Sequence, residues 1–173
     1  PEEALPFLTE LVKKEQPDII IGTSMGGMYA QQMRGVLRIC VNPAFQMSSL
    51  SKVLHTGTFK WLNGRKNHEK EFKVTHEILQ HFRAMERRQF DGITEADKEL
   101  CFGLFGMDDT TVNPMNACQT FLKHYPHATR FEGGHQLNEK VVRKVLLPLM
   151  QQLLGEVFEE ARKEPLPDYM RWG

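Results

Sequence analysis

The chain alternates short apolar runs with longer amphipathic stretches. Apolar runs bounded by glycine, proline or polar residues predict short strands, and stretches with apolar residues three and four apart predict helices. The expected strands are residues 19–21, 36–41, 100–105 and 127–131. The expected helices are residues 1–16, 26–33, 70–88 and 114–124, with a last helix that Asn138 caps. Alternating strands and helices indicate βαβ units, so the pattern predicts an α/β fold with a parallel sheet.

Residues 45–98 interrupt this alternation, because they mix aromatic residues with many charges and show no clear strand. We expect a mostly helical, lid-like insertion over the sheet edge where ligands bind. Loop statistics leave plain structural cover equally open. Phe59 and Trp61 are candidates for lining a substrate pocket, although aromatic residues near helices more often belong to a core. At 173 residues the chain suits a single domain, and residues 156–173 read as a polar C-terminal tail.

One turn carries the first chemical signal. Residues 22–26 read Gly-Thr-Ser-Met-Gly, directly between a predicted strand and a predicted helix. A serine at the apex of so sharp a turn holds its hydroxyl clear of the sheet, which makes Ser24 a candidate nucleophile. The N–H of Met25, at the start of the helix, would point to where an oxyanion forms. A glycine-rich turn also serves tight packing or phosphate binding, so the five residues alone are weak evidence.

Two further loops strengthen the signal. Asp108 and Asp109 follow the strand 100–105, and His135 follows the strand 127–131. Because parallel strands end at the same sheet edge, we expect these side chains to meet Ser24 there. Nucleophilic hydrolysis by serine needs a hydroxyl, an imidazole that takes its proton and a carboxylate that orients the imidazole. The sequence therefore predicts Ser24 as nucleophile, His135 as base and one of the two aspartates as acid.

The motifs resemble those of one superfamily. Residues 22–27 (GTSMGG) are similar to the nucleophile elbow of α/β-hydrolases, 106–112 (GMDDTTV) to their G-x-x-D-x-x-V loop, and 133–135 (GGH) to their histidine loop. Within that superfamily the compact plan resembles the small bacterial YqiA-like esterases. The resemblance implies a three-layer α/β/α sheet and the triad Ser24, Asp109 and His135, with Asp108 as the alternative acid. It also implies a second oxyanion donor from an early strand, which we expect to be missing, with the first strands, before Pro1.

The composition of the chain limits the kinds of partner and cofactor that we expect. The chain has 22 basic and 22 acidic residues, which does not favour nucleic acid or an anionic membrane, and no apolar run is long enough to span a membrane. Three cysteines without C-x-x-C spacing indicate reduced thiols in a cytoplasmic protein. His76 and His81 are five residues apart and do not form a metal-ligand pair, so we expect neither a metal nor a cofactor. A monomer or a homodimer is expected.

The three loops predict a serine hydrolase that acts through an acyl-enzyme, and the resemblance to α/β-hydrolases implies that its substrate is a small carboxylic ester or thioester. The alternative is a catalytically silent, hydrolase-like module that binds a small ligand or a partner. The missing oxyanion loop favours that alternative, and the intact Ser24, Asp109 and His135 positions count against it.

Overall fold

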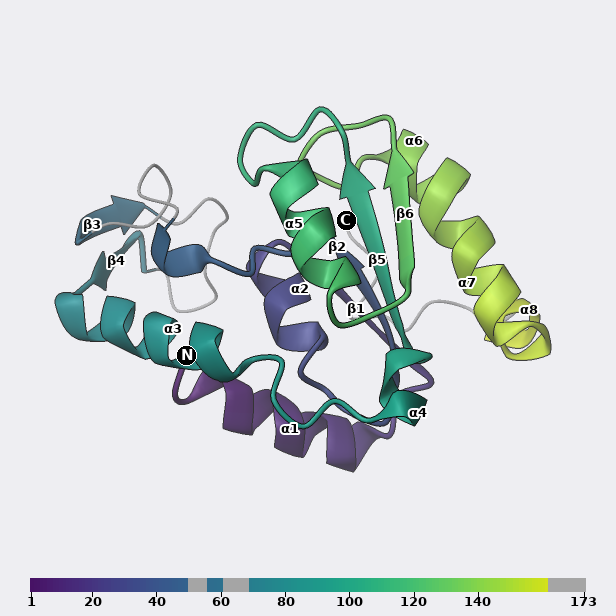
Figure 1. Cartoon of the computed structure of the whole chain (residues 1–173), viewed down its shortest axis with the longest axis horizontal. Helices are drawn as coiled ribbons and strands as arrows, with labels where there is room; N and C mark the ends of the chain where they lie inside the picture. Colours follow the sequence, from purple (N-terminus) through teal and green to yellow (C-terminus); the bar gives the residue numbers. More distant parts are fainter. Residues whose placement is uncertain (50–55, 61–68, 162–173) are drawn as a thin grey trace. The chain divides into compact units, whose positions relative to one another are not determined.

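The computed structural model describes residues 1–49, 56–60 and 69–161 (Figure 1). The chain divides into a first compact unit, Pro1–Gln136, and a second unit that begins at Leu137. The two units are described separately below, and the expected single domain over residues 1–173 stays a prediction.

The first unit is built on a four-stranded sheet. Its strands are β1 (Ile19–Thr23), β2 (Leu37–Val41), β5 (Cys101–Gly106) and β6 (His127–Phe131). They are all parallel and lie in the order β1-β2-β5-β6. The four strands that the apolar runs predicted are confirmed. Their carboxyl ends lie at one edge of the sheet, so the loops that carry the candidate residues also meet there.

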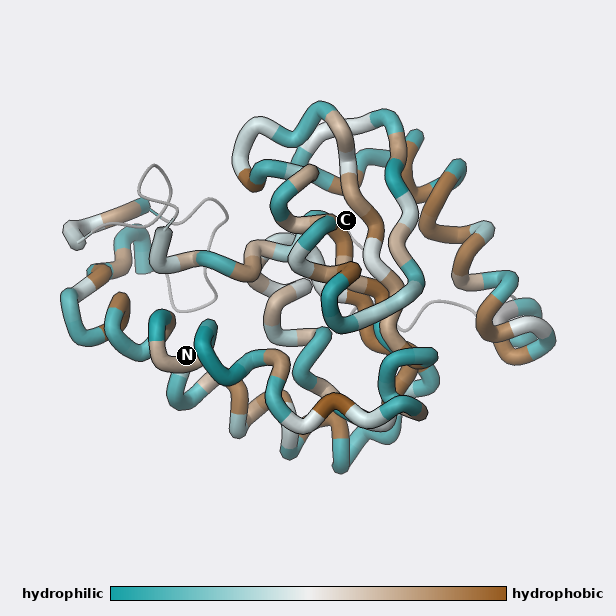
Figure 2. Tube along the Cα trace, in the orientation of Figure 1, coloured by the Kyte–Doolittle hydropathy of each residue, from teal (hydrophilic) through white to brown (hydrophobic). Residues whose placement is uncertain are grey.

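The described residues of this unit form five α-helices: α1 (Ala4–Glu15), α2 (Met25–Ala30), α3 (His76–Arg88), α4 (Glu95–Lys98) and α5 (Pro114–Leu122). α2 packs on β1 and β2, and α5 packs on β5 and β6 (Figure 1). The core between them combines buried side chains from strands and helices, among them Met28, Cys40, Phe105, Phe121 and Tyr125. Figure 2 shows the corresponding concentration of apolar residues along β5. The predicted parallel sheet flanked by helices is therefore confirmed.

The insertion at residues 45–98 differs from the expectation. It holds a short 3₁₀ turn, η1 (Met47–Ser49), and an antiparallel hairpin of β3 (Gly57–Lys60) and β4 (Glu71–Val74) before α3 and α4. The prediction of no strand here was wrong, because residues 71–74 alternate polar and apolar side chains, the period of a half-buried strand. The helix expected from residue 70 begins at His76, where the Thr75 hydroxyl accepts a hydrogen bond from the N–H of Ile78 (3.2 Å).

The second unit holds α6 (Glu139–Val141), a π-helical turn at Val142–Leu146, α7 (Leu147–Leu154) and α8 (Glu156–Ala161). Asn138 caps the first of these as predicted, since its Oδ1 accepts from the N–H of Val141 at 3.0 Å. Pro148 has no N–H to donate, and the π turn directly before α7 is where the regular helix is interrupted. The predicted tail at 156–173 begins as a helix, and its remaining residues lie outside the described ranges.

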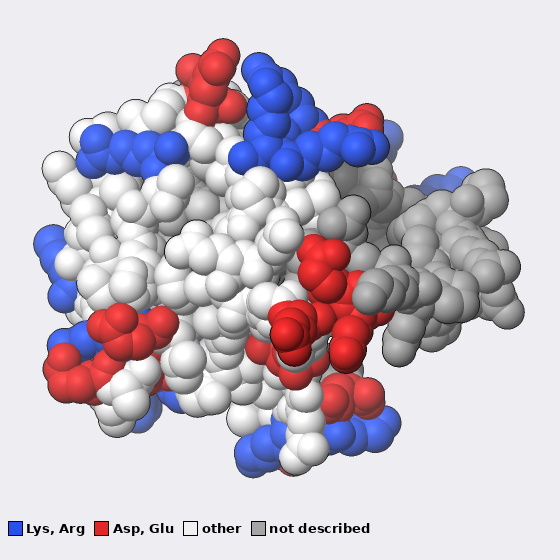
Figure 3. All heavy atoms as spheres, turned by 90° about the vertical axis from the view of Figure 1, so that its right-hand side faces the viewer, with Lys and Arg blue, Asp and Glu red and all other residues white. Residues whose placement is uncertain are grey.

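Across the described ranges, no helix combines the length and apolarity that crossing a membrane requires. Figure 3 shows both basic and acidic side chains on the face that it draws. That mixture agrees with the balanced charge of the sequence.

Candidate active site

Ser24 occupies a strained turn between β1 and α2. Its backbone has φ 54° and ψ −121°, a conformation that residues other than glycine rarely adopt. Hydrogen bonds hold it there: the Ser24 N–H donates to Val41 O (2.9 Å), and the Ser24 carbonyl accepts from the N–H groups of Gly27 and Ala44 (both 3.0 Å). The turn is therefore fixed by the end of β2 as well as by the helix that follows it.

The tightness of the turn depends on one glycine more than on the other. A Cβ at Gly22 would lie 2.2 Å from the carbonyl oxygen of Gly26, well inside contact distance. A Cβ at Gly26 would meet no atom within 4 Å. Of the two glycines, only Gly22 is required for the close approach of the strand and the helix.

The histidine lies between the serine and an aspartate. His135 Nε2 is 2.9 Å from Ser24 Oγ, and His135 Nδ1 is 2.7 Å from Asp109 Oδ2. An ionised carboxylate only accepts hydrogen bonds, so Nδ1 carries a proton, and in a neutral imidazole Nε2 is then free to accept from the serine hydroxyl. Loops after three different strands thus bring together the three residues that the sequence singled out.

The two candidate aspartates have different surroundings. The Asp109 side chain is only 1% exposed, and its Oδ1 accepts from the N–H groups of Thr111 (2.7 Å) and Val112 (2.9 Å). Asp108 is exposed, and its backbone N–H donates to Gly133 O at 3.0 Å. Asp109 therefore contacts His135, whereas Asp108 links the aspartate loop to the histidine loop through its backbone.

Met25 is the first residue of α2 and directly follows Ser24. The first N–H groups of a helix have no acceptor within the helix, so the Met25 N–H remains available to an anion. The Met25 residue is 40% exposed. This position suits the oxyanion-donor role that the sequence assigned to it.

Sequence reasoning missed Asn42, which it used only to mark the end of a strand. Asn42 is 2% exposed and has φ 45°. Its side-chain Nδ2 donates to the carbonyls of Gly134 and His135, both at 3.0 Å, and its Oδ1 accepts from the N–H of Gly106 at 2.7 Å. The available signal was an asparagine at a strand end, a residue that tolerates positive φ and carries both a donor and an acceptor.

The structure describes one of the two aromatic residues proposed to line a substrate pocket. Phe59 lies in β3 and stacks on Phe72 of β4, with ring centroids 5.6 Å apart. Trp61 lies outside the described residues. The described residues contain no cluster of three or more His, Cys, Asp or Glu side chains that could hold a metal ion.

Comparison with known proteins bears on the fold. No protein-family model and no curated protein matches the sequence. Among solved structures, Est1E from Butyrivibrio proteoclasticus is similar to this chain, with 14% identity and a TM-score of 0.57 over 87% of this chain and 69% of Est1E. Est1E with ferulic acid bound gives 15% identity and a TM-score of 0.55 over 92% of this chain and 68% of that one.

A protein from Agrobacterium vitis S4 whose crystal structure is described as that of a hydrolase gives 19% identity and a TM-score of 0.52. That match covers 91% of this chain and 66% of the other. The chain thus spans 66% to 69% of the length of these three structures. Together with the parallel sheet and its flanking helices, these likenesses show that the chain has the α/β-hydrolase fold.

Proposed function

We propose that the chain is a serine hydrolase that cleaves a carboxylic ester or thioester of a small substrate. The observation that carries the proposal is the position of the His135 imidazole, 2.9 Å from Ser24 Oγ and 2.7 Å from Asp109 Oδ2. A serine hydroxyl, an imidazole and a buried carboxylate in this order are the parts that acyl transfer requires. The α/β-hydrolase fold supports the proposal as an analogy only, since one fold hosts many functions.

In the first half of the reaction Ser24 Oγ attacks the carbonyl carbon of the substrate. His135 Nε2 takes the hydroxyl proton, and Asp109 stabilises the imidazolium through the Nδ1 hydrogen bond. The carbonyl oxygen becomes an oxyanion that the Met25 N–H can stabilise. His135 then gives its proton to the leaving alcohol or thiol, and an ester bond joins the acyl group to Ser24.

In the second half water attacks the acyl carbon, and His135 takes the proton from that water. The bond to Ser24 Oγ breaks, His135 returns the proton to the serine, and the carboxylic acid leaves. The side chain of His135 is 21% exposed, which gives water a route to the base, whereas the 1% exposure of Asp109 keeps its carboxylate for the imidazole.

The finer assignment to the YqiA-like esterases stays a prediction that rests on the three sequence motifs. Est1E has been crystallised with ferulic acid, a carboxylic acid of the kind that ester hydrolysis releases. That likeness supports a small carboxylic ester as the first substrate class to examine. The monomeric or homodimeric state and the cytoplasmic location also stay predictions.

The test is the intact mass of the chain after incubation with a fluorophosphonate, which forms a stable adduct with an activated serine. We expect a single adduct on the parent chain, no adduct on Ser24→Ala, and labelling slowed at least a hundred-fold in His135→Ala. His127→Ala is the matched control, because His127 pairs with Glu99 at 2.7 Å in an exposed site and touches none of the three residues.

A folded parent chain that takes up no fluorophosphonate would contradict the proposal. Such a result would favour the alternative of a catalytically silent binding module. An adduct that persists in Ser24→Ala would equally contradict it, because the reactive group would then be another residue.

A further inference from the structure

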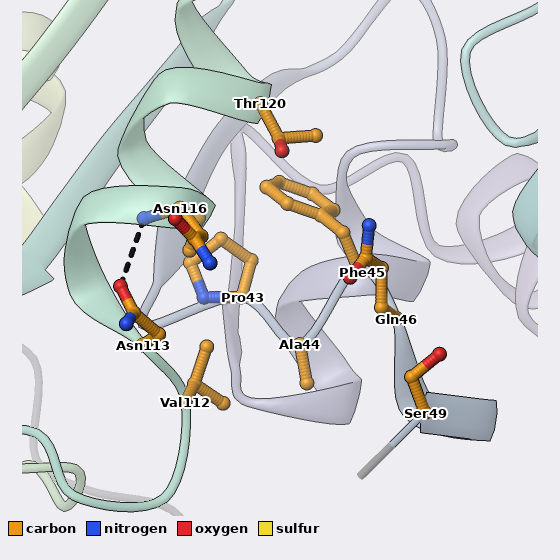
Figure 4. A pocket seen from close by; sticks show the side chains of 10 residues that line it. Pro43, Ala44, Phe45, Gln46, Ser49, Val112, Asn113, Asn116 and Thr120 are labelled. Carbon is orange, nitrogen blue, oxygen red and sulfur yellow. Dashed lines mark hydrogen bonds between the residues drawn. The ribbon is translucent and has the colours of Figure 1, made fainter.

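A cavity lies beside the candidate active site, between the segment 43–49 and the segment 112–120 (Figure 4). Its volume is about 190 Å³. Figure 4 shows Asn116 and Thr120, both on α5, facing Pro43 and Phe45 on the opposite wall. The cavity belongs wholly to the first unit.

Both walls are attached to the residues of the proposed triad. The N–H of Ala44 donates to the carbonyl of Ser24 at 3.0 Å, so one wall continues from the nucleophile turn. The N–H of Val112 donates to Asp109 Oδ1 at 2.9 Å, so the other wall continues from the acid loop. These two hydrogen bonds fix the cavity walls relative to Ser24 and Asp109. They would therefore also fix the position of a bound group relative to Ser24.

The residues that line the cavity determine which kind of group it can bind. Phe45 and Ala117 are buried and offer an apolar floor, whereas the amides of Gln46 and Asn116 and the hydroxyl of Thr120 offer hydrogen bonds. Among the described residues that line the cavity, none is ionisable. An apolar cavity of about 150 Å³ is known to accept benzene, so this volume suits a single ring or a branched group of similar size.

We propose that this cavity binds a compact, uncharged, ring-sized group of the substrate ester that carries a hydrogen-bonding substituent. The proposal rests on the proposed function and deepens it, since it names the substrate class. The group can come from the acyl or from the alcohol half of the ester, because both halves are bonded to the carbonyl carbon that Ser24 would attack.

The test compares the parent chain with Asn116→Phe, which places a ring in the cavity, and with Gln119→Phe, an exposed position on the same helix that does not line it. One arm varies the acyl group of ethyl esters, whose alcohol half has no ring: acetate, 4-hydroxybenzoate and decanoate. The other arm varies the alcohol of acetate esters: ethyl and 4-hydroxybenzyl. We expect Asn116→Phe to lower kcat/KM for the ring-bearing ester of one arm at least ten-fold, and for ethyl acetate less than three-fold. Gln119→Phe should match the parent throughout.

The two proposals fail separately. A parent that labels with fluorophosphonate and hydrolyses acetates, while Asn116→Phe changes neither arm, keeps the function and overturns the cavity assignment. If the parent does not label, binding decides: 4-hydroxybenzyl alcohol should shift the NMR signals of the Gln46 and Asn116 side-chain amides in the parent chain. Unshifted amide signals at millimolar alcohol would overturn the assignment.

A second inference follows independently from the contacts of Asn42. We infer that Asn42 is a positioning residue for the triad. Its side chain joins the end of β5, which leads to Asp109, to the carbonyl of His135 itself, while its own backbone continues the strand that holds the Ser24 N–H. The buried Asn42 side chain bonds to Gly134, His135 and Gly106. These three hydrogen bonds fix the distances between the loops that carry the proposed acid, base and nucleophile.

Two variants separate backbone from side chain at this position. Asn42→Gly keeps the positive φ and removes the three bonds, whereas Asn42→Asp keeps the acceptor for Gly106 and sets a carboxylate against two carbonyl oxygens. We expect both to slow fluorophosphonate labelling about ten- to hundred-fold, because small misplacements of reacting groups cost rates of that order. Asn42→Asp should also shift the pH profile of labelling to higher pH, since a nearby negative charge stabilises the protonated form of His135.

The matched control is Asn138→Asp, an exposed helix cap where aspartate caps equally well. Asn42 variants that fold and label at the parent rate, with the parent pH profile, would overturn the positioning role. A variant that does not fold is replaced by Asn42→Ser, whose shorter side chain cannot reach all three partners. The same labelling rate and pH profile then decide, since a purely structural residue would lower the melting temperature without moving either.

Discussion

The first unit holds two polar centres, one at each end of β2 and β5. At the carboxyl ends lie Ser24, His135 and Asp109. Near the amino ends lies a group that we call the basal network, which consists of Gln31, Arg34, Arg38, Asp97 and Tyr125. Both centres contain a buried aspartate that faces a basic side chain, yet they are built for different purposes.

In the basal network both arginines face the same buried aspartate: Arg34 Nη1 is 3.7 Å from Asp97 Oδ2, and Arg38 Nη1 is 3.0 Å from Asp97 Oδ1. Arg38 is fully buried, and its Nη1 donates to Asp97 Oδ1 at 3.0 Å and to the carbonyls of Met33 and Val36, both at 2.8 Å. Burial lowers the pKa of Arg38, but the neighbouring Cys101 and the hydrogen bond and charge of Asp97 outweigh it, so the pKa ends above its ordinary value. Arg38 consequently stays charged at any pH at which the protein folds.

The proposed triad differs in two respects. The side chain of His135 is 21% exposed, and its Nε2 faces the hydroxyl of Ser24 rather than a fixed carbonyl. A permanently charged, enclosed pair stabilises the sheet and has no proton to exchange. A titratable, partly exposed pair beside a nucleophile can move a proton. Exposure and proton exchange therefore distinguish the two centres, since burial of an aspartate is common to both.

Substitutions in the proposed triad should have the largest effect, and that effect should be on the rate of ester hydrolysis. Asp109→Asn should lower kcat/KM for a reactive ester about ten-thousand-fold, because the amide favours the wrong tautomer of His135. That factor corresponds to about 5.5 kcal/mol of transition-state stabilisation. Initial rates with p-nitrophenyl acetate measure it, and Asp108→Asn should keep the parent rate within a few-fold. Equal losses in both variants would remove the distinction between the two aspartates.

A substitution in the basal network should instead lower the stability of the folded chain. Asp97→Asn should lower the free energy of unfolding by about 3 to 5 kcal/mol, because it leaves the buried Arg38 charge without its counter-ion. Urea melts at pH 7 measure the loss. Glu99→Gln, which removes the exposed pair with His127, should cost less than about 1 kcal/mol. If Asp97→Asn instead slowed labelling of Ser24 in molecules that stay folded, the separation of the two centres would be wrong.

Much of the fold could be predicted because buried parallel strands leave an obvious pattern. Residues 100–105 are an apolar run since β5 lies inside the sheet and is almost wholly buried. Residues 19–21 are also an apolar run, although β1 is an edge strand and Ile21 is 38% exposed. The loops after both strands share one edge by topology alone. The three residues of the proposed triad were chosen from that topology and from their order along the chain. The hairpin of β3 and β4 was missed although residues 71–74 alternate polar and apolar side chains, because an alternation over only four residues is too short to distinguish a strand from the start of the helix that follows.

Contacts distant in sequence were also beyond prediction. Arg38 stands in an apolar run, but its partner Asp97 is 59 positions further along the chain, and only the folded topology brings them together. Asn42 is similar, since its bonds reach residues 92 and 93 positions away. The choice between Asp108 and Asp109 depended on which side chain points inward after the strand. Neighbouring residues point in different directions, so a shift of one residue changes the answer. Composition carries none of this information.

The proposed triad also depends on the close approach of β1 and α2, which Gly22→Ala would test. The added Cβ would lie 2.2 Å from the carbonyl of Gly26, so β1 and α2 must separate. We expect a loss of about 1 to 3 kcal/mol in stability, the usual cost of overpacking, together with slower labelling of Ser24. Gly26→Ala is the matched control, because it adds the same methyl group in open space. Thermal melts and labelling rates of the two variants should separate them, and similar values would show that the turn yields to a methyl group.

The weakest change should come from the basal network at high pH. Tyr125 is 1% exposed, and its hydroxyl donates to Gln31 Oε1 at 2.9 Å and accepts from Arg34. Burial raises the pKa of Tyr125 above its ordinary value, and the nearby Cys101 adds to the shift. An unfolded tyrosine ionises near pH 10, so above that pH the unfolded chain loses a proton that the folded chain keeps.

The stability that Tyr125 contributes should therefore be complete below about pH 10 and be lost as the pH rises from there through the folded pKa. Tyr125→Phe should cost about 1 to 2 kcal/mol at pH 7, because it removes the hydrogen bond to Gln31. It should also flatten the fall in stability between about pH 10 and pH 11, since phenylalanine has no proton to lose. Urea melts of parent and variant across that range measure both effects. A parallel fall in the two proteins would mean that Tyr125 ionises freely in the folded state, and that the basal network is as open to solvent as the triad.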